Sequence, residues 1–321
     1  MKKVVRCISV VGTTSVGKSE CALKLAQSFA TSYPAVYLLS VDSKQVFRGL
    51  ECLSGADIPA GFIRTHDAAL SERDFFSNGK LSLFGTACCE LSERWSVAHF
   101  KQYSLSVLQH AAEHDIPVIL VGGAGLYHEQ LFAQNAGVFV PPNTALRAEA
   151  ATSTAAELYE QLARTAPSVA QMLNNSDKHN PRRLVRALER VQAAAQEVEK
   201  TEELPFNYTG KIIGLRRPLE ATEAAIKQRV LDRFAATACN EVAAALQRNP
   251  SEQAVATLGF AECAAFLAGE VSRDECLRQW QLSELQYAKR QLTWWKRNAA
   301  VHWVERNNAR WFDQVLALAN D

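Results

Sequence analysis

The sequence lacks a net charge of either sign, since its 321 residues include 35 Lys and Arg against 34 Asp and Glu. A protein that coats nucleic acid through bulk electrostatics carries a large basic excess, so this class is excluded, although a local basic face for a specific RNA is not. Hydrophobic residues make up 48% of the chain, which excludes a disordered protein and allows a sizeable core.

Paired cysteines and long apolar runs are missing as well. The eight cysteines form no C-x-x-C pair, which argues against a zinc ribbon or finger, and their use as small buried hydrophobes suits a reducing cytoplasm. No stretch approaches roughly 18 apolar residues, so no membrane span is expected. The first apolar run, Val4–Val11, ends in a Gly-containing turn with no cleavage site, so it predicts a strand and not a signal peptide.

Alternating strand and helix patterns predict a doubly wound parallel α/β sheet. Apolar, β-branched runs predict strands, and apolar residues at helical spacing predict helices between them. The expected strands are Val4–Val11, Ala35–Val41 and Ile116–Val121, and the expected helices are Glu20–Ala30 and Val97–His114. Residues 52–94 show no clean period and are expected to form loops with one or two short elements.

From Gly125 the pattern becomes helical, and no strand interrupts 140–203, which predicts an inserted or appended helical unit. Its expected helices are Thr154–Arg164, Ser168–Leu173 and Pro181–Glu199. A strand then returns, followed by three long helical stretches, a short strand and a terminal helix: Lys211–Leu215, Glu220–Gln247, Ser251–Leu267, Arg273–Arg297, Val301–Val304 and Asn308–Ala319.

The strongest motif is Gly12-Thr13-Thr14-Ser15-Val16-Gly17-Lys18-Ser19, which fits the P-loop pattern G-x-x-x-x-G-K-[S/T] between a predicted strand and helix. Backbone N–H groups of such a loop surround phosphate oxygens, Lys18 adds a point charge, and the Ser19 hydroxyl can bind Mg²⁺. The motif predicts a diphosphate or triphosphate ligand. It leaves the reaction open, because kinases, NTPases and some transferases share it.

Two other segments end predicted strands at the edge of the sheet where ligands bind in open α/β folds. Asp42, in Val41-Asp42-Ser43-Lys44-Gln45, could bind Mg²⁺ or act as a general base, and it could equally cap a helix. Gly122-Gly123 could let the backbone approach a ligand or a neighbouring strand, or form a plain turn.

Basic residues recur at helical spacing in the second half of the chain. Arg182, Arg183 and Arg186 could read RNA phosphates, but a solvated surface balanced by glutamates explains them as well. Arg229 and Arg233 lie four residues apart and could clamp a diphosphate or pair with acids on the surface.

A late segment, 287–295, mixes basic and aromatic residues. Lys289 and Arg290 are compatible with nucleic-acid contact, whereas Trp294 and Trp295 are typical of core anchors.

Taken in order, these motifs resemble the tRNA dimethylallyltransferase family, also called tRNA isopentenyltransferases. Beyond the P-loop, the match covers most of the chain and runs through segments that are each similar to a family element. These are 42–49, like D-S-x-Q-x-Y-[RK]-G; 121–127, like V-G-G-T-x-x-Y; 180–189, like N-D-P-x-R-x-x-R-A-L-E; 228–234, like the R-x-x-x-R helix; and 258–260, 269–270, 288–294 and 302–303 in the last third.

The resemblance implies transfer of a dimethylallyl group from its diphosphate to N6 of the adenosine 3′-adjacent to the tRNA anticodon, in the cytoplasm, by a monomer that needs Mg²⁺. It implies a P-loop core in two parts, 1–135 and 206–321, around a tRNA-binding helical insertion, 136–205. The catalytic residues would be Asp42, Ser19 and Arg233, with Mg²⁺ on Ser19. The diphosphate would be bound by 12–19, Arg229 and Arg233, and tRNA by Asp42, Ser43, Lys44, Gln45, Gly123, Ala124, Arg182, Arg183, Arg186, Lys289 and Arg290.

The chain also departs from the family pattern. Ala124 stands in place of a tRNA-contacting Thr, Ala256 in place of an Arg, Phe47 in place of a Tyr, and Leu285 and Gln286 where an Arg is usual; the family landmarks of 52–94 are missing. Three alternatives therefore stay open: prenylation of free AMP, ADP or ATP, a P-loop small-molecule or nucleotide kinase, and an RNA-binding homologue without catalysis.

Overall fold

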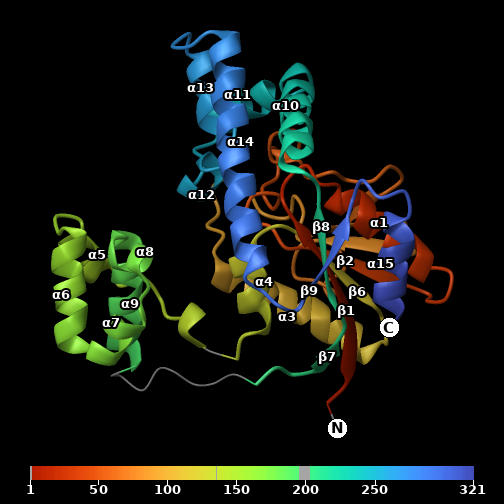
Figure 1. Ribbon diagram of the computed structural model, residues 1–321, viewed down its shortest axis with the longest axis horizontal. Helices are drawn as coiled ribbons and strands as arrows, with labels where there is room; N and C mark the ends of the chain where they lie inside the picture. Colours follow the sequence, from red (N-terminus) through yellow and green to blue (C-terminus); the bar gives the residue numbers. More distant parts are fainter. Residues whose placement is uncertain (1, 135, 195–202) are drawn as a thin grey trace. The chain divides into compact units, whose positions relative to one another are not determined.

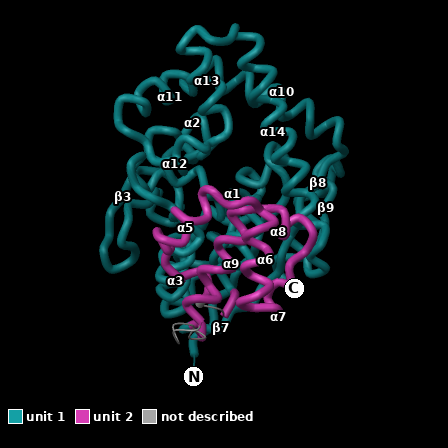
Figure 2. Tube along the Cα trace, turned by 90° about the vertical axis from the view of Figure 1, so that its left-hand side faces the viewer, with its two compact units in different colours: residues 1–132, 205–321 teal, residues 133–204 magenta. Residues whose placement is uncertain are grey.

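The computed structural model describes residues 2–134, 136–194 and 203–321. The chain forms two compact units (Figure 2), one made of Met1–Phe132 with Pro205–Asp321 and the other of Ala133–Leu204. In the described part of the chain, no helix is both long enough and apolar enough to span a membrane.

The larger unit is built on a nine-stranded sheet with the order β3-β4-β5-β2-β6-β1-β8-β9, in which β7 also pairs with β1. Figure 1 labels the strands β1, β2, β6, β7, β8 and β9 of this sheet. Its strands are β1 Val4–Gly12, β2 Val36–Ser40, β3 Ile63–Thr65, β4 Phe75–Ser77, β5 Leu81–Phe84, β6 Val118–Val121, β7 Asn207–Thr209, β8 Ile212–Arg216 and β9 Val301–Glu305. The sequence therefore predicted the central strands but missed β7.

The predicted α/β fold with a doubly wound parallel sheet is confirmed for the strands that surround the P-loop. β1 pairs in parallel with β6 and β8, and β2 pairs in parallel with β5 and β6. One edge of the sheet differs from this parallel part, because β3 and β4 form an antiparallel meander with β5.

Two hydrophobic cores lie on opposite faces of this sheet, because successive side chains of a strand point to opposite sides. Ile8 and Val10 of β1 pack with residues of α1 (Lys18–Phe29) and α15 (Trp311–Asn320). Val5 and Cys7 belong to the other core, which includes residues of α3 (Val97–Glu113). The sheet is thus covered on both faces, as a parallel sheet requires.

Two of the predicted long helical stretches are broken. The first divides at residues 236–237 into α10 (Leu219–Ala235) and α11 (Ala238–Leu246), and the second into α12 (Glu252–Val255) and α13 (Phe260–Leu267). Gly259 caps α13 with a φ of 90°, and a Cβ there would lie 2.3 Å from the Trp280 ring, so only glycine fits this break. The third stretch is one helix, α14 (Arg273–Lys296).

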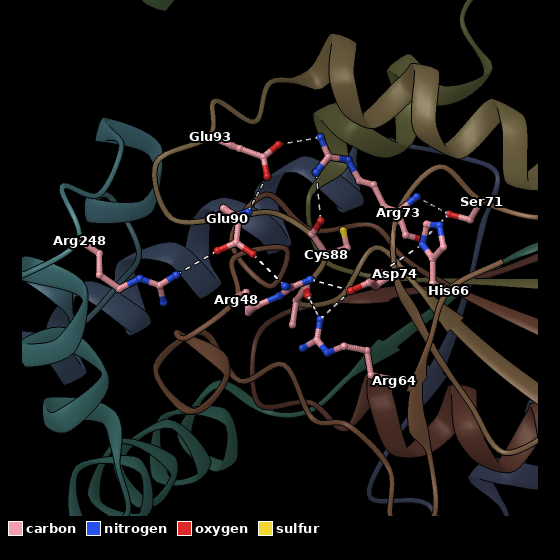
Figure 3. Close-up of polar contacts among 11 residues, drawn as sticks. Arg48, Arg64, His66, Ser71, Arg73, Asp74, Cys88, Glu90, Glu93 and Arg248 are labelled. Carbon is pink, nitrogen blue, oxygen red and sulfur yellow. Dashed lines mark hydrogen bonds and ion pairs between the residues drawn. The ribbon is translucent and has the colours of Figure 1, made fainter. Parts of the chain in front are cut away.

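Residues 52–94 hold more structure than expected: most of α2 (Glu51–Ser54) and the whole β3–β5 meander. A network of ion pairs supports this segment (Figure 3). Asp74 accepts from Arg48, forms an ion pair with Arg64 and lies 3.2 Å from His66, and Arg48 also pairs with Glu90. These partners come from separate parts of the chain, and sequence periodicity gives no sign of them.

The smaller unit is helical, as the sequence predicted. It contains a 3₁₀ turn at Ala136–Val138 and the helices α5 Thr144–Ala150, α6 Ala155–Thr165, α7 Pro167–Met172, α8 Asn175–Lys178 and α9 Pro181–Ala194. The predicted continuation of α9 through Glu199 lies outside the described residues. Leu158, Leu162, Leu184 and Leu188 form the centre of its own core.

Candidate functional site

A cavity of about 640 Å³ opens in the larger unit where β1, β2 and β6 end. Thr14, Ser15, Gly17, Lys18 and Ser19 of the P-loop line one side of it. Other walls come from residues 42–45 after β2, residues 53–59 around α2, and helices α10 and α14. The sequence-predicted P-loop, the Asp42 segment and Arg229 therefore meet around one space.

The P-loop has the backbone that its glycines permit. Gly12 has a φ of 140°, and a Cβ at this position would lie 2.4 Å from the Leu215 carbonyl oxygen. Gly17 is in the left-handed region with a φ of 95° and caps α1. Thr13 and Val16, which belong to the loop, are buried. The first N–H groups of α1, at Lys18 and Ser19, stand at the cavity wall, where they favour an anion.

Lys18 is the cation at the centre of this wall. Its Nζ donates to the Thr13 carbonyl oxygen over 2.7 Å. Loss of hydration and, to a smaller extent, the nearby Arg229 lower the pKa of Lys18 to about 8, although Asp42 acts in the opposite direction. An anion bound here would therefore stabilise the protonated lysine.

Arg229 and Arg233 both stand on α10, but of the two only Arg229 lines the cavity. Arg229 Nη1 donates to the Thr14 hydroxyl over 2.8 Å. Arg233 is 7% exposed and its Nη1 lies 3.2 Å from Glu284 Oε1. Surface pairing with Asp232 or Glu223, the other possibility open from the sequence, is wrong, since those carboxylates contact Gln228 and Lys227.

Asp42 lies half-buried at the cavity wall beyond the end of β2. Its Oδ1 accepts from the backbone N–H groups of Lys44 at 2.8 Å and Gln45 at 3.3 Å, which is an Asx turn. No helix begins here in the part of the chain described, so the alternative of a helix cap is replaced by a turn. The side chains of Lys44 and Gln45 are tied to the carbonyl oxygens of Gln253 and Gly55.

The Gly122-Gly123 turn is required by close backbone approach. A Cβ on Gly122 would lie 2.0 Å from the Val41 carbonyl oxygen, and one on Gly123 would lie 2.0 Å from Gln291 Nε2. The Gly123 carbonyl oxygen also accepts from Trp295 Nε1 at 3.3 Å. Of this turn, Gly122 lines the cavity, while Ala124 stands just before α4 (Gly125–Phe132).

Helix α14 supplies a wall of which the sequence predicted Arg290 but not the other side chains. Glu284, Tyr287 and Gln291 line the cavity, and Gln291 Oε1 accepts from the Thr14 N–H over 2.7 Å. Their spacing of i, i+3 and i+7 puts them on one helix face, and this pattern could have located them. Arg290 also lines the cavity, Lys289 is exposed, and Trp295 is a buried core anchor.

The three arginines of α9 have different surroundings within the helical unit. Arg182 is exposed at the start of the helix, and Arg183 pairs with Asp177. Arg186 instead donates to the carboxylate of Glu189, whose side chain is fully buried and also binds Arg147. Arg186 further donates to the carbonyl oxygens of Gly137 and Val138, so its guanidinium also holds the unit together.

A family model described as IPP transferase matches residues 83–298, more than half of the chain. The chain belongs to the IPP transferase family. The resemblance read from the motifs is thereby confirmed.

The relatives cover the chain from end to end. The chain is similar to the tRNA dimethylallyltransferase of Limosilactobacillus fermentum, with 30% identity over 98% of both chains. It is also similar to the tRNA dimethylallyltransferase of a Synechocystis species, with 28% identity over 99% of this chain and 97% of the relative.

Solved structures show the same fold. The full-length tRNA isopentenylpyrophosphate transferase of Bacillus halodurans aligns with a TM-score of 0.66 and 24% identity, over 98% of this chain and 94% of that one. A eukaryotic dimethylallyltransferase acting on tRNA aligns with a TM-score of 0.72 and 16% identity, over 96% of this chain and 76% of that one.

Proposed function

We propose that this protein transfers a dimethylallyl group from dimethylallyl diphosphate to N6 of the adenosine that follows the tRNA anticodon, releasing diphosphate. The observation that carries the proposal is the meeting of Lys18, Arg229 and Asp42 at one cavity in a member of the IPP transferase family. An anion site and a carboxylate in one space suit a displacement in which diphosphate leaves and an amine attacks.

The cationic end of the cavity binds the leaving diphosphate. Backbone N–H groups of the P-loop, Lys18, Arg229 and Arg233 would offset the negative charge that grows as the C–O bond breaks. Arg229 and Thr14 are already joined, so this end of the site is organised before the ligand arrives.

Asp42 acts on the nucleophile. The N6 amine of adenine is a weak nucleophile because its lone pair is delocalised into the ring. As N6 bonds to the allylic carbon, the C–O electrons go to the diphosphate and the N6 proton goes to Asp42. The Asx turn holds one carboxylate oxygen of Asp42. The other oxygen is the proposed proton acceptor.

The residues around Ser19 fit Mg²⁺. The Ser19 hydroxyl and the carboxylates of Asp42 and Asp57 line the cavity, and hard oxygen donors of this kind suit the ion. Within the described residues, no group of three or more His, Cys, Asp and Glu could hold a metal. Ser19 and the oxygens of the diphosphate would therefore supply the ligands. When bound, Mg²⁺ neutralises diphosphate charge.

The helical unit is proposed to bind the anticodon stem-loop. Arg182 and Arg183 stand exposed at the start of α9 and are suited to phosphate contact. Arg290 lines the cavity and Lys289 is exposed beside it, so both are proposed to contact the RNA near the target base. These contacts would offset the few kcal/mol needed to turn the base out of its stack.

The remaining parts of the proposal follow the family resemblance. Ser43, Lys44, Gln45, Gly123 and Ala124 are proposed to lie along the RNA, and the protein is proposed to act as a cytoplasmic monomer.

The test is incubation of the protein with dimethylallyl diphosphate and Mg²⁺, together with unmodified tRNA, AMP or ATP in separate reactions. Mass spectrometry of the nucleosides is expected to show prenyl-adenosine from tRNA alone. Prenylated AMP or ATP would replace the proposed acceptor by a free nucleotide. Consumption of ATP without prenylation would replace the proposed reaction by a kinase.

A further inference from the structure

A buried carboxylate faces the proposed diphosphate site from α14. Glu284 is 5% exposed and lines the cavity. Its Oε1 lies 3.2 Å from Nη1 of Arg233, and the two side chains are 7% and 8% exposed. A carboxylate at this place opposes the binding of an anionic ligand, so the presence of Glu284 needs a physical reason.

The two terminal nitrogens of Arg233 differ in their hydrogen bonding. Its Nη1 donates to both Glu284 and the Leu53 carbonyl oxygen, while its Nη2 is buried and has no hydrogen-bond partner among the residues that the structure describes. A Cβ on Gly55 would lie 1.7 Å from Arg233 Nη2 and 2.1 Å from Arg229 Nη2, so both guanidinium groups pack against this glycine, which leaves no room for a side chain. Arg233 does not line the cavity itself, but its partners Leu53 and Glu284 do, so this nitrogen lies directly behind the cavity wall.

Stability does not explain the pair. Taking two charges out of water costs about as much as their attraction returns, so a buried ion pair is weak support for folding. Within the site, however, the pair has a direct electrostatic effect. Glu284 reduces the field that Arg233 presents to a ligand, and at short range in a partly dry site such a charge changes affinity strongly.

Substrate and product differ in charge. The prenyl diphosphate has one oxygen alkylated, and the free diphosphate has the same oxygen ionisable. A fixed carboxylate therefore repels the product more than the substrate. We propose that Glu284 is a specificity residue for product release: it competes with diphosphate for Arg233 and disfavours the free diphosphate relative to its prenyl ester. The inference rests on the proposed function.

The experiment compares wild type with Glu284→Gln, which removes the charge and keeps the shape, and with Glu284→Ala. Calorimetry measures the dissociation constants of inorganic pyrophosphate and of dimethylallyl S-thiolodiphosphate, an unreactive substrate analogue. Glu275→Gln is the matched control, because Glu275 is on the same helix but pairs with Arg278 away from the cavity. Circular dichroism checks that each variant is folded.

In both Glu284 variants, pyrophosphate is expected to bind about tenfold tighter or more, with a smaller gain for the analogue. Product inhibition by pyrophosphate should rise in parallel, and Glu275→Gln should match wild type. If Glu284 had only a structural role, both variants would bind pyrophosphate and the analogue more weakly than wild type.

The results separate this inference from the proposed function. Equal or weaker pyrophosphate binding in folded Glu284 variants, with wild-type prenyl transfer intact, overturns the product-release role alone. Wild-type protein that binds neither ligand overturns both. If Glu284→Gln does not fold, the ratio of pyrophosphate affinity to analogue affinity in Glu284→Ala tests the inference instead. If neither variant folds, Glu284 has a structural role and the inference is overturned.

Discussion

Replacing Asp42 by Asn tests its role as the base without disturbing its turn. Asp42 Oδ1 accepts from two backbone N–H groups, and an Asn side-chain oxygen can accept the same bonds. Asp42→Ala removes both, at about 0.5–1.5 kcal/mol each. We expect Asp42→Ala to be about 1–3 kcal/mol less stable by urea unfolding, and Asp42→Asn to be close to wild type.

Catalysis, unlike stability, should be impaired in both variants, because neither keeps the carboxylate that accepts the proton. Loss of a positioned general base lowers the rate by about 10²–10⁴, equivalent to roughly 2.7–5.5 kcal/mol of barrier. Single-turnover prenylation of tRNA with labelled dimethylallyl diphosphate measures this, and pyrophosphate binding serves as the control for an intact anion site. Asp42→Asn with a wild-type rate would refute the assignment and leave Asp42 as a turn residue.

Three other predictions concern charges that the structure places. Because the pKa of Lys18 is lowered to about 8 in the free protein, Lys18 loses its charge above that pH, and diphosphate affinity should fall from pH 8 to 9.5. Binding should then take up a proton, which calorimetry in two buffers detects. An affinity that does not change with pH would show that the charge of Lys18 does not contribute to diphosphate binding. Arg182→Ala should weaken tRNA binding and reduce the slope of log K against log salt by about 1, as measured by filter binding; an unchanged slope would remove Arg182 from the RNA face. Glu189→Gln should loosen the helical unit by about 1–3 kcal/mol, since it removes a buried acceptor shared by Arg147 and Arg186, and hydrogen exchange in α9 should rise; wild-type protection would contradict this.

The parts of the site that the sequence predicted are contiguous in the chain. The P-loop is a strand, a glycine turn and a helix start within 16 residues of one another, from β1 to α1. Local rules determine such a unit: Gly17 needs a positive φ, and the N–H groups of the helix start bind anions. Asp42 was found in the same way, because it follows directly after an apolar strand.

Segment 52–94 could not be predicted by those rules. Its β3–β5 meander is short, and Asp74 is placed by Arg64 and His66 from within the segment and by Arg48 from outside it (Figure 3). Arg248, which follows α11, also pairs with Glu90. Long-range pairs leave no periodic pattern, so a propensity argument sees only mixed turn residues and charges.

The cavity wall formed by α14 shows a different limit of prediction from the sequence. Glu284, Tyr287 and Gln291 recur at the spacing of a helix face, which in a sequence indicates burial but not what the face is buried against. Packing of α14 beside α10 brings Glu284 to Arg233, a residue 51 positions away in the chain. A motif can therefore predict which cations bind a diphosphate, but the net charge that the ligand meets depends on this tertiary contact. If the Glu284 variants bind pyrophosphate more tightly, the affinity of the site will be seen to depend on a residue outside every phosphate-binding motif.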